Sequence, residues 1–397
     1  MSERQSLAGG MRQLTRDGGR RGVSVLTACV AGLAVLYAPI ALTSMWFAFE
    51  PGAPRLQERL DAWVSGDSYA TGHGSVAAVR ATDYVDHRLV MLVHTVLGGL
   101  ALLLAALQLV AVSRARRHLH RLVGRAYFAL MTASMAAALV FLVVSPQVPV
   151  VGQVAFRWQL WVLALSTLGS AWLALSAARR GDVVAHRAWM ALNIAFMLTA
   201  PVLRLTWTVL GPLFPEHDML TNLEVGAVVL AVAAPAGGAL VLMLQGASRR
   251  GPDLPAGRGL ASRRRYVALA GLGCALVVVS HPGEAAGPAG YPWFHVAPVL
   301  GLLVICGIGE RRTRGGESES REWEALVLGV ALAPWAAILV GVAAATSIGA
   351  TEAYLAGLMV APGVPIVAAF GWIVGRRARA EHRGVEASVT VTAGQHR

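Results

Sequence analysis

The sequence is poor in charged residues. Only 14% of its 397 residues are charged, whereas 56% are hydrophobic. A soluble globular domain carries roughly 25% charged residues, so this composition excludes a water-soluble fold. The repeated long apolar runs also exclude the disordered, collagen-like and coiled-coil classes.

Lysine is absent, and all 34 basic residues are arginines. Together with the 43 glycines, this usage is typical of a GC-rich bacterial genome. A net charge of +12 would suggest nucleic-acid binding in a soluble protein. Here the arginines cluster between apolar runs, which is the pattern that orients membrane helices. We therefore expect no nucleic-acid partner; the expected partner is a lipid bilayer with anionic headgroups on its cytoplasmic side.

Cysteine is also scarce. Cys29, Cys274 and Cys306 each lie inside an apolar run, where they are expected to be buried small hydrophobes rather than a disulfide or metal set. The sequence contains no Ser-His-Asp set, no HExxH or CxxC motif, no Walker loop and no dinucleotide fingerprint. These absences leave open whether the protein is an enzyme.

Ten apolar runs approach or exceed the length of about 20 residues that crosses a bilayer core. They predict an all-α, polytopic integral membrane protein. The predicted spans are about 23–48, 88–112, 123–145, 158–178, 188–210, 223–244, 266–281, 294–309, 324–348 and 354–374. If the N-terminus is cytoplasmic, 28 of the 34 arginines fall on the inner side, as the positive-inside rule requires. Both termini are therefore predicted to be cytoplasmic, with the chain in the inner membrane of a bacterium.

The segments between the spans divide the chain into five parts. The predicted parts are a basic cytoplasmic segment at 1–22, a six-helix membrane domain at 23–244, an Arg-rich cytoplasmic linker at 245–265, a four-helix membrane unit at 266–375 and a cytoplasmic tail at 376–397. A long outer loop at 50–87 carries six acidic residues. A second inner loop, ERRTRGGESESREWE, mixes both signs of charge and is expected to be solvated.

Histidines and intramembrane polar groups are the candidate functional residues. His94 lies in the second span. Two predicted cytoplasmic helix starts carry similar sequence motifs, HRLVGRAYF from His120 and HRAWMALNI from His186. Asn193 and Arg204 lie within the fifth span. An arginine at a helix centre costs about 2.5 to 3.5 kcal/mol on insertion scales, which makes Arg204 a candidate for function.

Four of these features, taken in order, resemble a known family. They are His94 in VMLVHTVLGGLALLLAALQL, the word HRLVGRAY, the word GDVVAHRAWM and the word APVLRL that contains Arg204. The segment of about 87–207 resembles an uncharacterised prokaryotic membrane family catalogued as domain of unknown function 2306. The resemblance does not cover the helices after residue 220. It implies a topology and candidate residues, but no reaction.

The first function class is a redox protein that binds haem or interacts with quinone. Two histidines on facing helices at matching depth can hold the iron of a b-type haem, and His120 and His186 are the predicted iron ligands. Gly124, one turn from His120, would give the macrocycle clearance, and His94 could act at the outer side. Three arginines beside the histidines could pair with the propionates, namely Arg121, Arg125 and Arg187.

Three other interpretations stay open. His and Arg at a helix start could simply anchor the helix in the headgroup zone. A small-molecule transporter or exporter would place Arg204, His94 and Asn193 along a pathway. Against it stands the lack of a clear repeat and of paired broken helices, although five prolines could kink spans: Pro201, Pro298, Pro334, Pro362 and Pro365. An enzyme acting on a lipidic substrate would need acids near the bilayer surface, such as Asp83, Asp86 or Glu224, whereas Glu352 is expected to be a solvated cap.

Overall fold

The computed structural model describes residues 25, 27–109, 116–145, 152–245, 259–287, 289–312 and 317–394. Over these ranges the secondary structure is helical, without a strand. Nine of the described helical segments are long and apolar enough to cross a membrane. The predicted all-α polytopic class is therefore confirmed.

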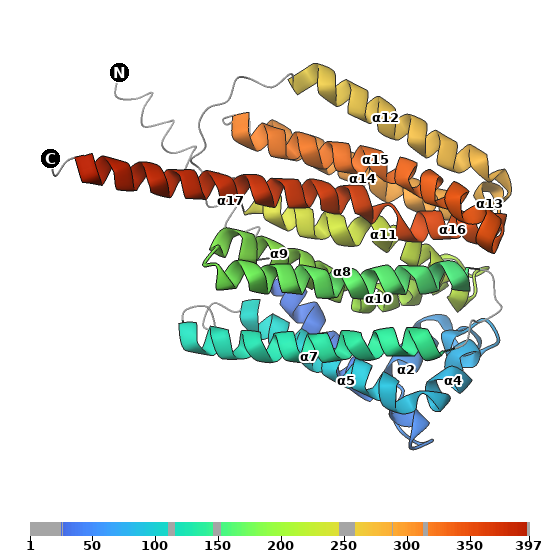
Figure 1. The fold of residues 1–397 in the computed structure, drawn as a ribbon. Coiled ribbons are helices and arrows are strands. Elements are labelled where there is room, and N and C mark those ends of the chain that lie inside the picture. The colour runs from blue at the N-terminus through green and yellow to red at the C-terminus, as the bar shows by residue number, and fades with distance from the viewer. Residues whose placement is uncertain are drawn as a thin grey trace, which may run out of the picture.

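The long helices follow the predicted spans closely. The first segment is Thr27–Ala48, which ends in the short 3-10 helix η1 (Trp46–Ala48). The others are α5 (Arg88–Leu109), α7 (Arg117–Val144), α8 (Gln153–Arg179), α9 (Val183–Met197) with α10 (Thr199–Leu213), α11 (Met219–Leu244), α14 (Tyr291–Arg312), α15 (Glu317–Ile348) and α16 (Ala350–Val360) with α17 (Gly363–Gly394). In addition, α12 (Gly259–Ser280) covers the predicted seventh span and runs alongside the other long helices (Figure 1).

The helices form three tiers, visible in Figure 1 as α5 with α7, then α8 to α10, then α12 and α14 to α17. Helix α11 lies between the second and third tiers and contacts α9, α10, α14, α16 and α17. Of its membrane-spanning window 67% is buried, compared with 28% in α5. The apolar core around α11 draws on both predicted membrane units, with Leu192, Val232, Val330 and Phe370 in one cluster. The last four spans therefore complete the same bundle as the first six.

Short helices gather at one end of the bundle. They are α2 (Leu56–Ser65), α3 (Asp67–Thr71), α4 (Val76–Asp86) and α13 (Pro282–Ala286), and the C-terminal end of α17 lies at the opposite end (Figure 1). We call the end with α2–α4 and α13 the outer end, following the predicted orientation. The predicted outer loop at 50–87 is thus mostly helical, and two of its acids, Asp61 and Asp83, are buried.

Three segments at the inner end differ from the predictions. Helix α12 already begins at Gly259, within the predicted linker at 245–265, and α17 continues to Gly394, through most of the predicted tail at 376–397. The expectation of a solvated mixed-charge loop was wrong for Glu322, which belongs to α15 and is only 1% exposed. Burial is possible because Arg377 of α17 neutralises this carboxylate, with Nη2 2.6 Å and Nε 3.1 Å from Glu322 Oε2.

Two spans are interrupted. The fifth breaks at Leu198, between α9 and α10, and the tenth breaks at Ala361–Pro362, between α16 and α17. Each break has a proline close by, Pro201 and Pro362, and proline cannot donate the backbone hydrogen bond that continues a helix. Leu198 and Ala361 keep right-handed helical backbone angles, so the two spans are kinked rather than unwound. The expectation that this chain lacks paired broken helices therefore stays a prediction.

Candidate functional site

His94 connects two neighbouring helices. Its Nδ1 lies 3.0 Å from the carbonyl oxygen of Ser134 on α7, and the Ser134 hydroxyl donates to the carbonyl oxygen of His94 at 2.7 Å. Gly98, one turn along α5, leaves space for this contact, since a Cβ there would lie 3.0 Å from Ser134 Oγ. These reciprocal contacts hold α5 against α7 and fix the orientation of the imidazole.

Asn193 is fully buried in a polar cluster that joins three helices. Tyr127 of α7 donates its hydroxyl to Asn193 Oδ1, and Asn193 Nδ2 donates to the carbonyl oxygen of Thr167 at 2.8 Å and to Ser170 Oγ at 3.2 Å. The amide therefore has partners at both its oxygen and its nitrogen, as a buried polar group requires. This cluster positions α7, α8 and α9 relative to one another.

His120 and His186 lie at matching positions on α7 and α9. Tyr127 and Asn193, which contact each other, each stand seven residues after their histidine. His186 Nδ1 lies 3.0 Å from the carbonyl oxygen of Ala174, and the carbonyl oxygen of His120 accepts a bond from Gln108. The three arginines predicted beside them are exposed, namely Arg121, Arg125 and Arg187.

Arg204 lies near the outer end, between aromatic rings. Its guanidinium carbon is 5.7 Å from the ring centre of Tyr37 and 5.6 Å from that of Trp207. Trp207 in turn donates its indole N–H to Asp61 of α2 at 3.3 Å. Because Asp61 is buried, its pKa is raised, although hydrogen bonds from Thr208, Gln57 and Trp207 oppose that shift. Arg204 thus connects α10 to the first span through Tyr37, and Trp207 connects α10 to α2.

A buried carboxylate at the outer end forms the centre of a second polar group. Glu224 of α11 is 3% exposed and accepts a hydrogen bond of 2.6 Å from the Tyr291 hydroxyl and one of 3.3 Å from Gln153 Nε2. Glu352 of α16 lies beside it and accepts bonds from the backbone N–H groups of Gly152 and Ala155. We call Gln153, Glu224, Tyr291 and Glu352 the outer carboxylate site.

Gly152 allows the two carboxylates to approach each other. Its φ is +84°, which favours glycine, and a Cβ there would lie 2.1 Å from Glu224 Oε1. Gly152 immediately precedes α8, whose N-terminal N–H groups attract negative charge. Glu352 is half-buried and caps α8, so the expected cap belongs to a different helix from the one that carries Glu352.

A basic side chain, Arg80, reaches the outer carboxylate site indirectly. Arg80 of α4 donates to Gln153 Oε1 at 2.9 Å and to Asp83 at 3.2 Å. Asp83 also accepts a bond of 3.1 Å from Ser145. Arg80 therefore neutralises Asp83, whereas the neutral amide of Gln153 separates it from Glu224.

The two helix breaks lie at the same depth. The rings of Trp189 and Phe370 contact each other at 5.2 Å between α9 and α17. Leu198 lies nine residues after Trp189 in the fifth span. Ala361 lies nine residues before Phe370 in the tenth span, which is the same direction in space because the two spans are antiparallel. At 1.5 Å per residue, each break lies about 14 Å from the contact.

Helix α11 passes between the breaks and has its own proline at this depth. A Cβ on Gly363 would lie 3.1 Å from the carbonyl oxygen of Ala231 and 3.3 Å from Pro235 Cγ. We call Pro201, Pro235 and Pro362 the proline layer. Because each proline lacks an N–H, the carbonyls four residues earlier lose their helical donor: Met197, Ala231 and Leu358.

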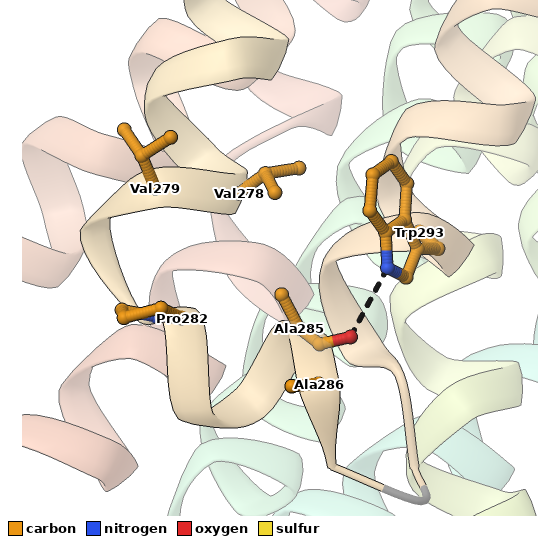
Figure 2. A pocket seen from close by; sticks show the side chains of 6 residues that line it. All are labelled: Val278, Val279, Pro282, Ala285, Ala286 and Trp293. Atoms are coloured by element: carbon orange, nitrogen blue, oxygen red, sulfur yellow. Dashed lines mark hydrogen bonds between the residues drawn. The ribbon is translucent and has the colours of Figure 1, made fainter.

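A shallow groove occurs elsewhere on the molecule. Figure 2 shows Val278 and Val279 of α12 opposite Trp293 of α14, whose indole N–H donates to the carbonyl oxygen of Ala285 at 3.1 Å. The groove has a volume of about 320 Å³, and no ionisable side chain lines it. It is therefore separate from the polar chemistry of the outer carboxylate site.

Sequence reasoning missed most of the outer carboxylate site. Glu224 stands out in the sequence because it is an acid within an apolar span, and it was considered only as one acid of a lipid enzyme. Its partners come from three other helices, and no local pattern connects Gln153, Tyr291 and Glu352 to it. The buried pair Glu322–Arg377 was missed for the same reason.

Comparison with known proteins gives a family match for part of the chain. No curated protein and no solved structure matches the chain. The matched region runs from α5 to most of α11, so it includes Glu224 and extends beyond residue 220, where the sequence resemblance was expected to end. Residues 91–236 match the family described as "Predicted membrane protein (DUF2306)", which confirms the resemblance to domain of unknown function 2306 for this part of the chain.

Proposed function

We propose that this multi-pass membrane protein is a small-molecule transporter. The observation that carries the proposal is the proline layer, where two interrupted spans lie at one depth on either side of α11. Prolines within membrane helices free backbone carbonyls, which neighbouring helices, side chains or ordered waters then satisfy. Interrupted helices in transporters use the freed carbonyls to coordinate ions and substrates.

The positions of the breaks favour the same conclusion. With α12 as the seventh span, the fifth and tenth spans are the last of two successive groups of five, and they cross the membrane in opposite directions. Interrupted segments at corresponding places in two halves are the best sequence-level indicator of a transport site. The carbonyl oxygen of Ala231, aimed at Gly363, supplies a polar group at the centre of this layer.

Cysteine accessibility tests the proposal without knowledge of the substrate. Thr199→Cys and Ala361→Cys would each be made in a chain whose three native cysteines are replaced by alanine. Both positions are buried, at 7% and 2% exposed, and both lie at the breaks. We expect a water-soluble, membrane-impermeant thiol reagent to label both, because a transport pathway admits water to this depth.

Ala101→Cys is the matched control. Ala101 is fully buried in the middle of the uninterrupted helix α5, so it should not react. Failure of both break positions to react from either side of sealed vesicles would overturn the transporter proposal. Labelling of the control at the same rate would do the same, since it would show general loosening of the bundle.

A haem-binding redox protein is the second candidate. The contact between Tyr127 and Asn193 supports it, because that contact sets His120 and His186 at equal distances along α7 and α9. A hydrogen bond from His186 Nδ1 to the Ala174 carbonyl would leave Nε2 as the ligating nitrogen, which is the usual arrangement of a metal-bound histidine. His120 and His186 would hold the iron, and a bound haem would supply one-electron transfer.

A visible spectrum of the purified protein, oxidised and then reduced with dithionite, tests the haem candidate. A Soret band with sharpened α and β bands, lost in His120→Ala and in His186→Ala, would support haem binding. A colourless protein from haem-replete cells would eliminate this candidate and leave the transporter proposal unaffected.

The placement in the cell is also a proposal. The arginine distribution supports a bacterial inner membrane with both termini in the cytoplasm, where exposed arginines such as Arg121 and Arg187 contact anionic headgroups. Protease protection of tags at the two termini in oriented vesicles tests this orientation.

A further inference from the structure

We propose that Glu224, beside Glu352, is a proton-binding site that is occupied at neutral pH. The inference does not depend on transport, because it concerns an equilibrium of the resting protein. It assigns a ligand, the proton, to the outer carboxylate site.

The first argument is the proximity of two carboxylates, neither of which accepts a hydrogen bond from a basic side chain in the described part of the chain. Both contact Gly152, Glu352 through the backbone N–H and Glu224 across the space that a Cβ would fill. Two carboxylates that share a site of low dielectric cannot both ionise readily. A proton that Glu224 takes up from solvent relieves that repulsion, and no bond other than the new O–H bond changes.

The second argument is the identity of the neighbours from each packed helix. Helix α14 contributes Tyr291, which donates to Glu224, and α8 contributes the neutral amide of Gln153. Asp218, the N-cap residue of α11, adds further negative charge at this end, and Glu284 of α13 lies near Tyr291. Arg80 of α4 donates to Gln153, not to either carboxylate of the site, and is paired with Asp83.

The third argument is an orphaned imidazole next to the site. His295 is fully buried, and neither of its ring nitrogens has a hydrogen-bond partner in the part of the chain that the structure describes. It stands four residues after Tyr291 on α14 and therefore shares a face with it. A buried polar group without a partner is costly, and a water molecule on this face of α14 would supply that partner.

Infrared difference spectroscopy of the full-length protein over a pH series tests the proposal. We expect a protonated-carboxyl C=O band at neutral pH that disappears as the pH is raised. Glu224→Gln should remove this band. Glu50→Gln, an exposed glutamate at the same end, is the control and should leave it unchanged.

Two further variants keep the test decisive if Glu224→Gln does not fold. Glu352→Gln removes the like charge, so the band should disappear at a pH roughly one unit lower. Tyr291→Phe removes a donor that favours the ionised form, so the band should persist to higher pH. Absence of the band from the wild-type protein at neutral pH, or a band that none of these variants alters, would overturn the proposal. The cysteine-labelling outcome is independent of this result.

Discussion

The molecule buries an acidic side chain at each end of the helix bundle, and the two are stabilised in opposite ways. At the inner end, Glu322 is held by the guanidinium of Arg377 at 2.6 Å, with both side chains almost fully buried. At the outer end, Glu224 has a tyrosine, an amide and a second carboxylate as neighbours. The inner site is a neutral ion pair, whereas the proton that we propose for Glu224 would lower the charge of the outer site from two negative charges to one.

The comparison indicates which of the two buried acids has a structural role and which is the candidate for function. An ion pair with complementary charge can be explained by the packing of α15 against α17 alone. An acid that lacks an adjacent cation is costly to maintain inside a membrane protein, and such residues mark proton relays and ion pathways. The outer site is therefore the better candidate for chemistry, and substitutions at the two ends should have different effects.

The largest effect is expected at the inner site. Glu322→Gln should lower the free energy of unfolding by about 3 to 5 kcal/mol, because it leaves the charge of Arg377 buried without a partner. Thermal unfolding in detergent would measure this loss. Glu381→Gln, an exposed position on α17, is the matched control. Adding Arg377→Gln should restore most of the stability; if the double variant is no better than the single one, the ion-pair interpretation is wrong.

A smaller effect is expected at Arg204. Arg204→Ala removes the contacts of the guanidinium with Tyr37 and Trp207, and cation–π contacts contribute about 0.5 to 2 kcal/mol. The same thermal unfolding measurement applies, with the exposed Arg379→Ala as the control. Equal and negligible effects of the two substitutions would remove Arg204 from the candidate residues.

Asp61 extends the comparison to a buried acid outside the bundle. Burial raises its pKa in the folded protein, so the folded state holds the proton more tightly than the unfolded state. Its contribution to stability is therefore present at low pH and decreases as the pH rises from the unfolded to the folded pKa. Unfolding measured across this acidic range should show that decrease, and Asp61→Asn should reduce it. An unchanged slope in the variant would contradict the assignment.

The smallest effect on stability is expected at Glu224 itself. Glu224→Gln retains an acceptor for Tyr291 and removes the need for a proton, so the free energy of unfolding should change by less than about 1 kcal/mol near neutral pH. Above neutral pH the variant should become the more stable protein. A loss as large as that of Glu322→Gln would show that Glu224 is buried as a charged group with a compensating cation.

The membrane-spanning helices could be predicted from the sequence because each of them requires only a local run of apolar residues. About 20 apolar residues in succession suffice to cross a bilayer as a helix, whatever the rest of the chain does. The same reasoning listed Pro201 and Pro362 as possible kinks. It could not predict that the two breaks lie at one depth, since that relation depends on the contact between Trp189 and Phe370.

The candidate residues were predicted less completely. His94, Asn193 and Arg204 were recognised as unusual polar groups, and the structure gives His94 and Asn193 hydrogen-bonded partners across helices. Three of the exposed arginines were expected to pair with propionates, and nothing in the described contacts tests that role. Glu224 was noticed as an acid, but its association with Glu352 required the fold.

The sequence by itself determined that this protein is an all-α chain that crosses the membrane many times, because apolar length and the scarcity of charge leave no other stable arrangement in water or lipid. Only the tertiary structure decided which buried charges are neutralised and which are not. Arg377 meets Glu322 although the chain between them makes two further passes through the bundle, and Glu224 meets Glu352 instead of a cation. Charge compensation depends on distances of a few ångströms between helices, and no pattern along the chain encodes those distances.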